Sequence, residues 1–234
     1  MDPRAIPVAS ARVDGQHGRP YLLVNEQLLM TPGGVPVEPA SDELAEEMAW
    51  ELMRDGMADV TLPSLYAFYS TQCDFIDPAP ARTVDALIEL LEHDYLLHPD
   101  SRLGMRQMQV AAWGPQIELW QRVVGREPPC ASPYSDSDIP DAAYAGFRRL
   151  LAGFSPAQLT VAIQSANLLK SVTLGILLAQ RSIDADTAIE AVAVTLRLMA
   201  GDMHDELERQ DEREESWGEA VNRLLRYAEV SEGS

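Results

Sequence analysis

Apolar residues along this chain change their spacing near residue 40. Before that point they come in short runs, "YLLV" and "QLLM", which flank Asn25 and Glu26 in the manner of a β-hairpin. The following "TPGG" indicates a turn, and "VPVEP" indicates a short extended piece whose prolines suit only the edge of a sheet. We therefore expect a small antiparallel β unit that is too small to hold a core alone and packs on helices.

After residue 40 the apolar residues recur every three or four positions, which predicts a series of amphipathic helices. Ser41 is expected to cap the first helix, with Trp50 lying off its apolar stripe. That stripe consists of Leu44, Met48 and Leu52. The other helices are predicted over residues 62–76, 82–100, 104–125 with a bend at 114–115, 141–153 and 155–180, and the last from about 187 to beyond 217.

Strands followed by helices indicate the α+β class with the two kinds of element segregated. We expect a small N-terminal β-rich domain with flanking helices over residues 1–80 and a mostly α-helical domain over residues 81–234. No internal repeat of fixed period is present that would indicate a solenoid.

The most apolar stretch, residues 155–180, is apolar almost all round and is expected to be one central buried helix. It contains Lys170, which is the only lysine among the 18 basic residues of the chain. A buried ammonium group needs a carboxylate or backbone acceptors, whereas a side chain that reaches the surface needs neither. The sequence leaves both arrangements open.

Charge narrows the classes of partner. The chain of 234 residues carries a formal net charge of −19, which argues against binding to nucleic acid or to an anionic membrane surface and favours a partner with a basic or mixed surface. No apolar run approaches the about 20 residues of a membrane span, and the first residues have no signal-peptide core. Cys73 and Cys130 show no disulfide pattern, which fits a reducing compartment.

Motifs that carry catalysis or bind cofactors are missing from the sequence. His93 and His98 are spaced by five residues, which matches no helical face, and no CxxC or HxxxH context accompanies them. Phosphate-binding, dinucleotide-binding and nucleophile-elbow motifs are absent. Paired carboxylates are abundant only because the chain is acidic, so we expect no catalytic residue, no metal and no cofactor.

The acidic stretch "DELERQDEREESWGE" over residues 205–219 is predicted to be helical and not a disordered tail. Residues spaced three or four apart run through it as one stripe that is apolar at both ends and polar between. The stripe consists of Met203, Leu207, Gln210, Glu214, Trp217, Val221 and Leu224. We expect its polar middle to leave the core.

Several segments, in order along the chain, resemble one known family. The segment "VNEQLLMTPGGVPVEP" keeps a Thr-Pro pair, "LLEHDYLLHPD" keeps Asp94, and "RQMQVAAWGPQIELW" keeps Trp113. The segment "NLLKSVTLGILLAQRSIDADTAIEA" keeps Lys170 and Ser171. The series is similar to the ATP synthase assembly chaperones of mitochondria and alphaproteobacteria, which bind the free α subunit of the catalytic head.

The resemblance implies a binding protein and not an enzyme. A member of that family covers the nucleotide-binding face of the unassembled α subunit, where the β subunit later docks, and an apolar interface of that kind would self-associate if left bare. The implied compartment is the mitochondrial matrix, or the cytoplasm of an alphaproteobacterium. No cofactor, nucleic acid or membrane insertion is implied.

The chain departs from the family at its acidic helix. Members place an acidic cluster and a Trp-Gly pair close after the last matched segment, whereas here they come about fourteen residues later, or about 21 Å along a helix. The resemblance then implies partner contacts at Asp211, Glu215, Trp217 and Gly218. Either an insertion carried the site outward, or the site was lost and the protein became a permanent accessory subunit of a mitochondrial ATP synthase or another complex.

Overall fold

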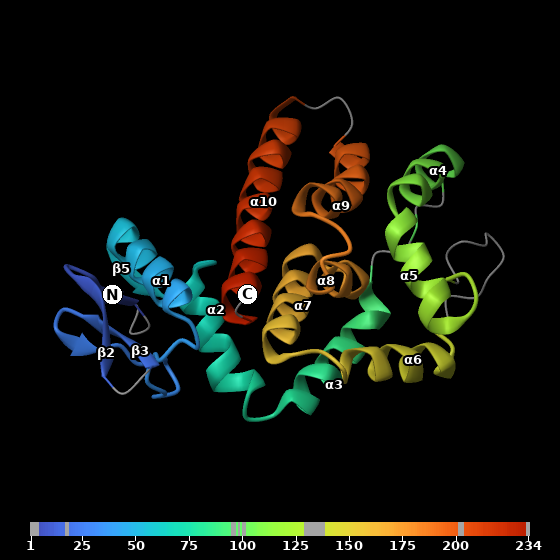
Figure 1. Cartoon of the computed structure of the whole chain (residues 1–234). Helices are drawn as coiled ribbons and strands as arrows, with labels where there is room; N and C mark the ends of the chain where they lie inside the picture. The colour runs from blue at the N-terminus through green and yellow to red at the C-terminus, as the bar shows by residue number, and fades with distance from the viewer. Residues whose placement is uncertain are drawn as a thin grey trace. The chain divides into compact units, whose positions relative to one another are not determined.

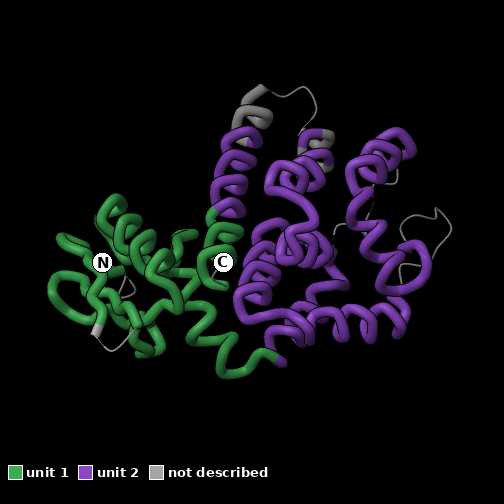
Figure 2. Tube along the Cα trace, viewed as in Figure 1, with its two compact units in different colours: residues 1–80, 223–234 green, residues 81–222 purple. Residues whose placement is uncertain are grey.

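The computed structural model describes residues 5–16, 19–94, 97, 99, 102–128, 139–200 and 204–232. The described strands all lie before residue 60, and the described chain after them is helical (Figure 1), which confirms the predicted α+β class. The chain divides into two compact units, residues 1–80 with 223–234, and residues 81–222 (Figure 2). The expected boundary after residue 80 coincides with this division, and residues 223–234, which we expected in the helical domain, group with the first unit.

The strands of the first unit form two small antiparallel sheets. β1 (Ala5–Pro7) pairs with β5 (Met57–Asp59). The second sheet has three strands in the order β2 (Ala11–Gln16), β3 (Arg19–Val24) and β4 (Gln27–Leu28). Neither sheet is large enough to enclose a core by itself, so both need helices to bury their apolar side chains.

The predicted hairpin is the connection between β3 and β4. Val24 pairs with Gln27, and the two residues between them, Asn25 and Glu26, have φ of 51° and 62°. Two successive left-handed residues are typical of a type I′ turn, whose twist matches that of the strands. The Asn25 side chain also accepts a hydrogen bond from the Ala9 N–H at 2.8 Å, which fixes the turn against the chain before β2.

The predicted "TPGG" turn is also present. The Gly34 N–H donates to the Thr31 carbonyl at 2.9 Å, and Gly34 has φ of 81°, a conformation that favours glycine. Asp74 holds the turn from a distance in the sequence, since its carboxylate accepts from the Thr31 hydroxyl at 2.5 Å and from the Gly33 N–H at 2.8 Å.

Helix α1 (Asp42–Asp55) supplies much of the core of the first unit. The Ser41 hydroxyl accepts from the Leu44 N–H at 3.1 Å, which confirms the predicted N-cap. The predicted stripe is at most 2% exposed in all its members, Leu44, Met48 and Leu52. Trp50 is 64% exposed, as its position off the stripe predicted.

The helix predicted over residues 62–76 begins later than expected. Ser64 caps α2 (Leu65–Thr71) by accepting from the Ala67 N–H at 3.1 Å, so Pro63 precedes the helix instead of lying in its first turn. The last part of the predicted segment is a π-helix, η1 (Gln72–Ile76). The half-buried Cys73 in η1 is a free thiol, and Cys130 lies outside the described residues.

The last turns of α10 (His204–Glu232) complete the core of the first unit. Leu224, Tyr227 and Val230 are at most 2% exposed. The Tyr227 ring meets Phe68 edge to face with centroids 6.0 Å apart, and its hydroxyl donates to the Gln72 side chain at 2.7 Å. This core therefore joins residues from both ends of the sequence.

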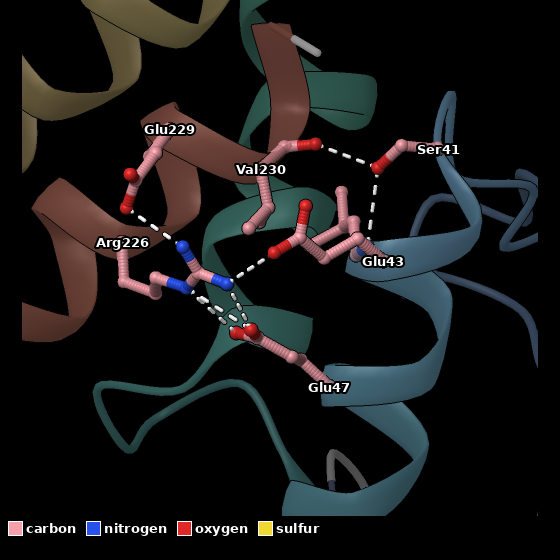
Figure 3. Close-up of polar contacts among 7 residues, drawn as sticks. Ser41, Glu43, Glu47, Arg226, Glu229 and Val230 are labelled. Carbon is pink, nitrogen blue, oxygen red and sulfur yellow. Dashed lines mark hydrogen bonds and ion pairs between the residues drawn. The ribbon is translucent and has the colours of Figure 1, made fainter. Parts of the chain in front are cut away.

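Polar contacts tie the same turns of α10 to α1 (Figure 3). The Ser41 hydroxyl donates to the Val230 carbonyl at 2.6 Å while it caps α1. The guanidinium of Arg226 hydrogen-bonds three surrounding carboxylates, those of Glu43, Glu47 and Glu229. The C-terminal turns are therefore fixed by both apolar and charged contacts.

The described part of the second unit is helical. Its elements are α3 (Pro80–Leu90), the 3-10 helix η2 (Leu91–His93), α4 (Leu103–Ala112), α5 (Gly114–Val124), α6 (Asp141–Leu151), α7 (Pro156–Leu169), α8 (Val172–Ala179), α9 (Ala185–Ala200) and the earlier turns of α10. The bend predicted at residues 114–115 is a break between α4 and α5, with Pro115 in the first turn of α5. The helix predicted to reach residue 100 ends ten residues earlier, at Leu90.

The prediction of one long apolar helix over residues 155–180 is wrong. The segment forms two helices, α7 and α8, which are separated at Lys170. The two helices then pack so closely that a Cβ on Gly175 would lie 2.4 Å from the Ala162 carbonyl oxygen. Ser155 and Pro156 begin α7 as predicted, with a capping box between Ser155 and Gln158. The hydrophobic pattern runs through the break because both helices are buried.

The last helix, predicted as continuous from about residue 187, is likewise two helices. α9 ends at Ala200 and α10 begins at His204, and residues 201–203 lie outside the described part of the chain. The acidic stretch is helical throughout residues 205–219, as predicted.

Candidate functional site

The four residues expected to contact a partner lie on α10 within the second unit, but they do not share one face. At about 100° of rotation per residue, Asp211, Glu215 and Gly218 fall within about 60° of one another, whereas Trp217 lies about 160° from Glu215. Asp211 and Glu215 are exposed, and Trp217 and Gly218 are half-buried. The helix therefore brings the acids together and separates the tryptophan from them.

A buried stripe runs along α10 between these two groups. Gln210 is 4% exposed, Glu214 7% and Val221 0%. Our expectation that the polar middle of the stripe leaves the core is therefore wrong for these residues. The side chains of Met203 and Leu207, at the start of the predicted stripe, lie outside the described part of the chain.

Glu214 stays buried because a cation on α9 meets it. The Arg197 guanidinium donates to both carboxylate oxygens of Glu214, with Nε 3.0 Å from Oε1. The Gln210 amide also donates to Glu214 at 3.0 Å, and Arg197 reaches Glu190 at 3.2 Å. The hydrogen bond to Glu214 is the main cause that raises the pKa of Arg197. The sequence identified Glu214 and Gln210 as members of a stripe but missed Arg197, since their contact crosses between helices.

The exposed face of α10 in the second unit is strongly acidic. Among residues 210–222, whose side chains are described, four carboxylates are exposed, those of Asp211, Glu212, Glu215 and Glu219. Three of them are spaced by four residues and so form a row along the helix. A row of like charges on one helix face is suited to a partner that presents arginine or lysine.

Two of the positions expected from the family resemblance, Asp94 and Ser171, meet at the start of α8. Asp94 is 1% exposed, and its carboxylate accepts hydrogen bonds from the Ser171 hydroxyl at 2.9 Å and from the Thr173 N–H at 2.8 Å. Ser171 is also the N-cap of α8, accepting from the Leu174 N–H at 3.2 Å. Asp94 thus fixes the helix start from 77 residues away, and its charge is favoured at a helix N-terminus.

Lys170 lies in the break and not inside a helix. It has φ of 56° and ψ of 34°, the left-handed conformation that ends α7, and its side chain is exposed. Of the two arrangements that the sequence left open, the exposed one is therefore present. Leu90, His93, Asn167 and Lys170 contribute to the lining of a pocket of about 270 Å³ at this break.

Trp113 has a structural position. It is 2% exposed, and its Nε1–H donates to the Ala191 carbonyl at 2.9 Å. The bond joins the break between α4 and α5 to the middle of α9. Burial of this side chain leaves no surface on it for a partner.

Carboxylates whose pKa is raised by burial lie outside the acidic row on α10 and outside the pocket. Burial raises the pKa of Glu51 and of Asp77, both in the first unit, and neither lines the pocket at Lys170. Within the described ranges, no three histidine, cysteine or acidic side chains are grouped so that they could hold a metal ion. No helix in the same ranges is both long enough and apolar enough to cross a bilayer.

Comparison with known proteins gives a match in fold. No family model and no curated protein matches the sequence. Two solved structures of Atp12 from Paracoccus denitrificans, one of them a point mutant, have a TM-score of 0.74 at 20% identity and match 95% of this chain and 97% of theirs. A protein of Agrobacterium tumefaciens, named as a candidate chaperone, has a TM-score of 0.72 at 19% identity over 95% of this chain and 85% of its own. The chain therefore shares its fold with Atp12 over nearly its whole length.

Proposed function

We propose that this chain is a divergent ATP synthase assembly chaperone that binds the free α subunit of the catalytic head. The observation that carries the proposal is the agreement between the ordered sequence resemblance and the fold shared with Atp12 over 95% of the chain. The resemblance was drawn from short segments, and the fold comparison covers the regions between them as well.

The contact of Asp94 with Ser171 adds support. Both residues were singled out by their resemblance to the family, in segments far apart in the sequence, and their side chains bond at 2.9 Å in a buried site. In this chain the pair fixes the start of α8. Two separate segments that carry the resemblance therefore meet in the fold, and this agreement supports the proposed function.

The proposed action is to mask the interface of the α subunit that later receives the β subunit. The acidic row with Asp211 and Glu215 on α10 would guide approach to a basic surface, since exposed charges set association rate more than affinity. Trp217, half-buried at the other edge of the stripe, would supply an aromatic anchor together with Gly218. We place this action in the mitochondrial matrix or in the cytoplasm of an alphaproteobacterium, with no enzymatic step.

The test is binding to purified α subunit in the absence of β. We expect a stable complex that dissociates when β subunit is added, because the two proteins compete for one face. Failure of the chain to bind free α subunit at micromolar concentration would refute the chaperone proposal.

A substitution at Trp217 tests where the chain contacts the α subunit. Trp217→Ala is expected to weaken binding to the α subunit by about thirtyfold, the effect of a typical interface anchor, while the melting temperature changes little. Trp50→Ala is the matched control, since Trp50 is 64% exposed in the first unit. Unchanged affinity with a lowered melting temperature would show that Trp217 serves the core only.

The displaced position of the acidic helix favours a second function, a permanent accessory subunit of an ATP synthase or another mitochondrial complex. The acidic stretch lies on α10, a helix separate from the α9 segment that ends the resemblance. Sedimentation of native cell extract separates the two functions. A permanent subunit migrates wholly with the large complex, and a chaperone remains in a light fraction.

A further inference from the structure

A second candidate site lies where α7 meets α8, and no described residue of α10 lines it. The pocket measures about 270 Å³. Leu90, Ala166 and Val172 form an apolar floor, next to which the buried Ser171 also lines the pocket, and the exposed polar side chains of His93, Asn167 and Lys170 form the rim. The combination of apolar lining with a few polar groups is typical of small-ligand sites.

The polar groups of the rim are available to a ligand. Within the part of the chain that the structure describes, the side chains of His93, Asn167 and Lys170 make no hydrogen bond and no ion pair. An ammonium group, an amide and an imidazole together offer several N–H donors. Such a set matches a ligand that presents acceptor oxygens.

The backbone of Lys170 gives an independent reason to consider its side chain. Glycine is the usual residue in the left-handed conformation that ends a helix, because any side chain is strained there. The chain instead has its only lysine at this position, with φ of 56°. The break therefore fixes the Lys170 backbone beside the pocket, so its ammonium group extends from a defined position on the lining.

Charge and size define the ligand. The net charge of −19 and the carboxylate of Asp94, hydrogen-bonded to the pocket residue Ser171, disfavour a dianion such as phosphate beside one lysine. A single carboxylate is compatible with one ammonium group. At about 270 Å³, the pocket lies just below the roughly 300–1,000 Å³ of typical ligand pockets, so its ligand is small.

We propose that this pocket binds a small monocarboxylate carried on an apolar body, of the size of a chain-terminal leucine or a short fatty acid. The carboxylate meets Lys170 and the rim, and the apolar body contacts Leu90, Ala166 and Val172. This inference does not depend on the proposed chaperone function, since the site needs no α subunit.

The direct test is calorimetric titration of the full chain with 4-methylpentanoate. We expect saturable binding, with 4-methylpentanamide at least tenfold weaker because it lacks the charge. Acetate and inorganic phosphate are expected to bind at least tenfold more weakly than 4-methylpentanoate, since acetate lacks the apolar body and phosphate lacks it and carries excess charge. Absence of 4-methylpentanoate binding, or equal affinity for the amide, overturns the proposal.

Two glycine variants separate a role in binding from a role in the backbone. Lys170→Gly relieves the left-handed strain, so we expect an unchanged or higher melting temperature together with about tenfold weaker binding of 4-methylpentanoate. Arg181→Gly is the matched control, because Arg181 also has positive φ, 53°, is exposed and does not line the pocket. Unchanged affinity of Lys170→Gly, or an equal loss in Arg181→Gly, overturns the role of Lys170.

A last pair of probes distinguishes the source of the carboxylate. A hexapeptide that ends in leucine with a free carboxylate is compared with the same peptide amidated. Tighter binding of the free peptide than of 4-methylpentanoate identifies a polypeptide C-terminus as the ligand. Weaker binding of the free peptide, with 4-methylpentanoate still bound, identifies a small carboxylate.

Discussion

The two parts of α10 are held in different ways. In the first unit its buried side chains are apolar or aromatic, as Leu224 and Tyr227 are. In the second unit the buried stripe contains Gln210 and Glu214, and the Glu214 carboxylate accepts hydrogen bonds from Arg197 of α9 and from the Gln210 amide. The buried contacts of α10 are therefore apolar in the first unit and include a charged network in the second, and the two sets of contacts should respond differently to mutation, salt and pH.

The largest expected loss of stability comes from the apolar contacts of α10 in the first unit. Tyr227→Ala removes a ring that is 1% exposed, packed on Phe68, and should lower the free energy of unfolding by about 3–5 kcal/mol. Tyr227→Phe keeps the ring and loses only the hydrogen bond to Gln72, so a loss of about 1 kcal/mol is expected. Denaturant unfolding measures both, and hydrogen exchange should show the loss of protection in α1 and α2. Similar losses in the two variants would contradict the importance of the ring.

The second-largest loss of stability should come from the charged contact between Arg197 and Glu214. Arg197→Met leaves the carboxylate of Glu214, which is 7% exposed, with only the Gln210 amide, and should cost about 2 kcal/mol. The cost lies below that of a fully buried pair because the Arg197 side chain is 45% exposed. Glu190→Gln is the control, since Glu190 contacts the same arginine but is 62% exposed, and should change stability by less than about 0.5 kcal/mol. If both variants were equally stable, Glu214 would not depend on Arg197.

The third prediction concerns the partly exposed charge of Arg226, in the part of α10 that belongs to the first unit. Arg226→Met removes bonds to Glu43, Glu47 and Glu229 and should cost about 1 kcal/mol at low salt, with the cost shrinking toward 1 M salt. Arg12→Met is the matched control on β2, where the arginine bonds two carboxylates, those of Asp14 and Glu26, and it should cost less. A cost for Arg226→Met that is independent of salt would show that packing of its stem, and not charge, fixes α10 to α1.

The smallest expected effect is a dependence on pH from Glu51 in the first unit. Burial raises the pKa of Glu51 in the folded chain, so the folded state holds this proton at a pH where the unfolded state has released it. The contribution of Glu51 is fully present below its ordinary pKa, and it is lost as pH rises through the folded pKa. Stability should therefore fall over that mildly acidic window, and in Glu51→Gln the fall should be shallower.

The control for this pH dependence is Glu46→Gln, an exposed carboxylate on the same helix, which should follow the unmodified chain. Thermal melts at pH 4, 5, 6 and 7 give the comparison. An unchanged pH profile in Glu51→Gln would show that the shifted proton does not contribute to stability.

Local chemistry allowed much of this fold to be predicted. Ser41 as a cap, the turn at Asn25 and Glu26, and the stripe on α1 all depend on residues within a few positions of one another. The break at Lys170 could not be predicted, because no glycine or proline marks it and the hydrophobic pattern continues through it. It is set by Asp94, which bonds Ser171 across 77 residues.

The candidate site was predictable only in part, for the same reason. The helical stretch around Asp211 and Glu215 was visible in the sequence, while the burial of Glu214 depends on Arg197 of another helix. The separation of Trp217 from the acids follows from helical geometry alone, and could have been obtained from the sequence by counting about 100° per residue. Whether this surface contacts the α subunit stays a prediction.

The bond from Ser41 to the Val230 carbonyl joins residues 189 positions apart, and it has a consequence for synthesis. The first unit needs residues 223–232 for its core, yet the ribosome makes all of residues 81–222 in between. At about 5–20 residues per second, that interval lasts on the order of 10 s. The core around the N-terminal strands and α1 therefore stays incomplete until residues 223–232 have been synthesised. The first part of the chain to be translated is then the last to complete its native core.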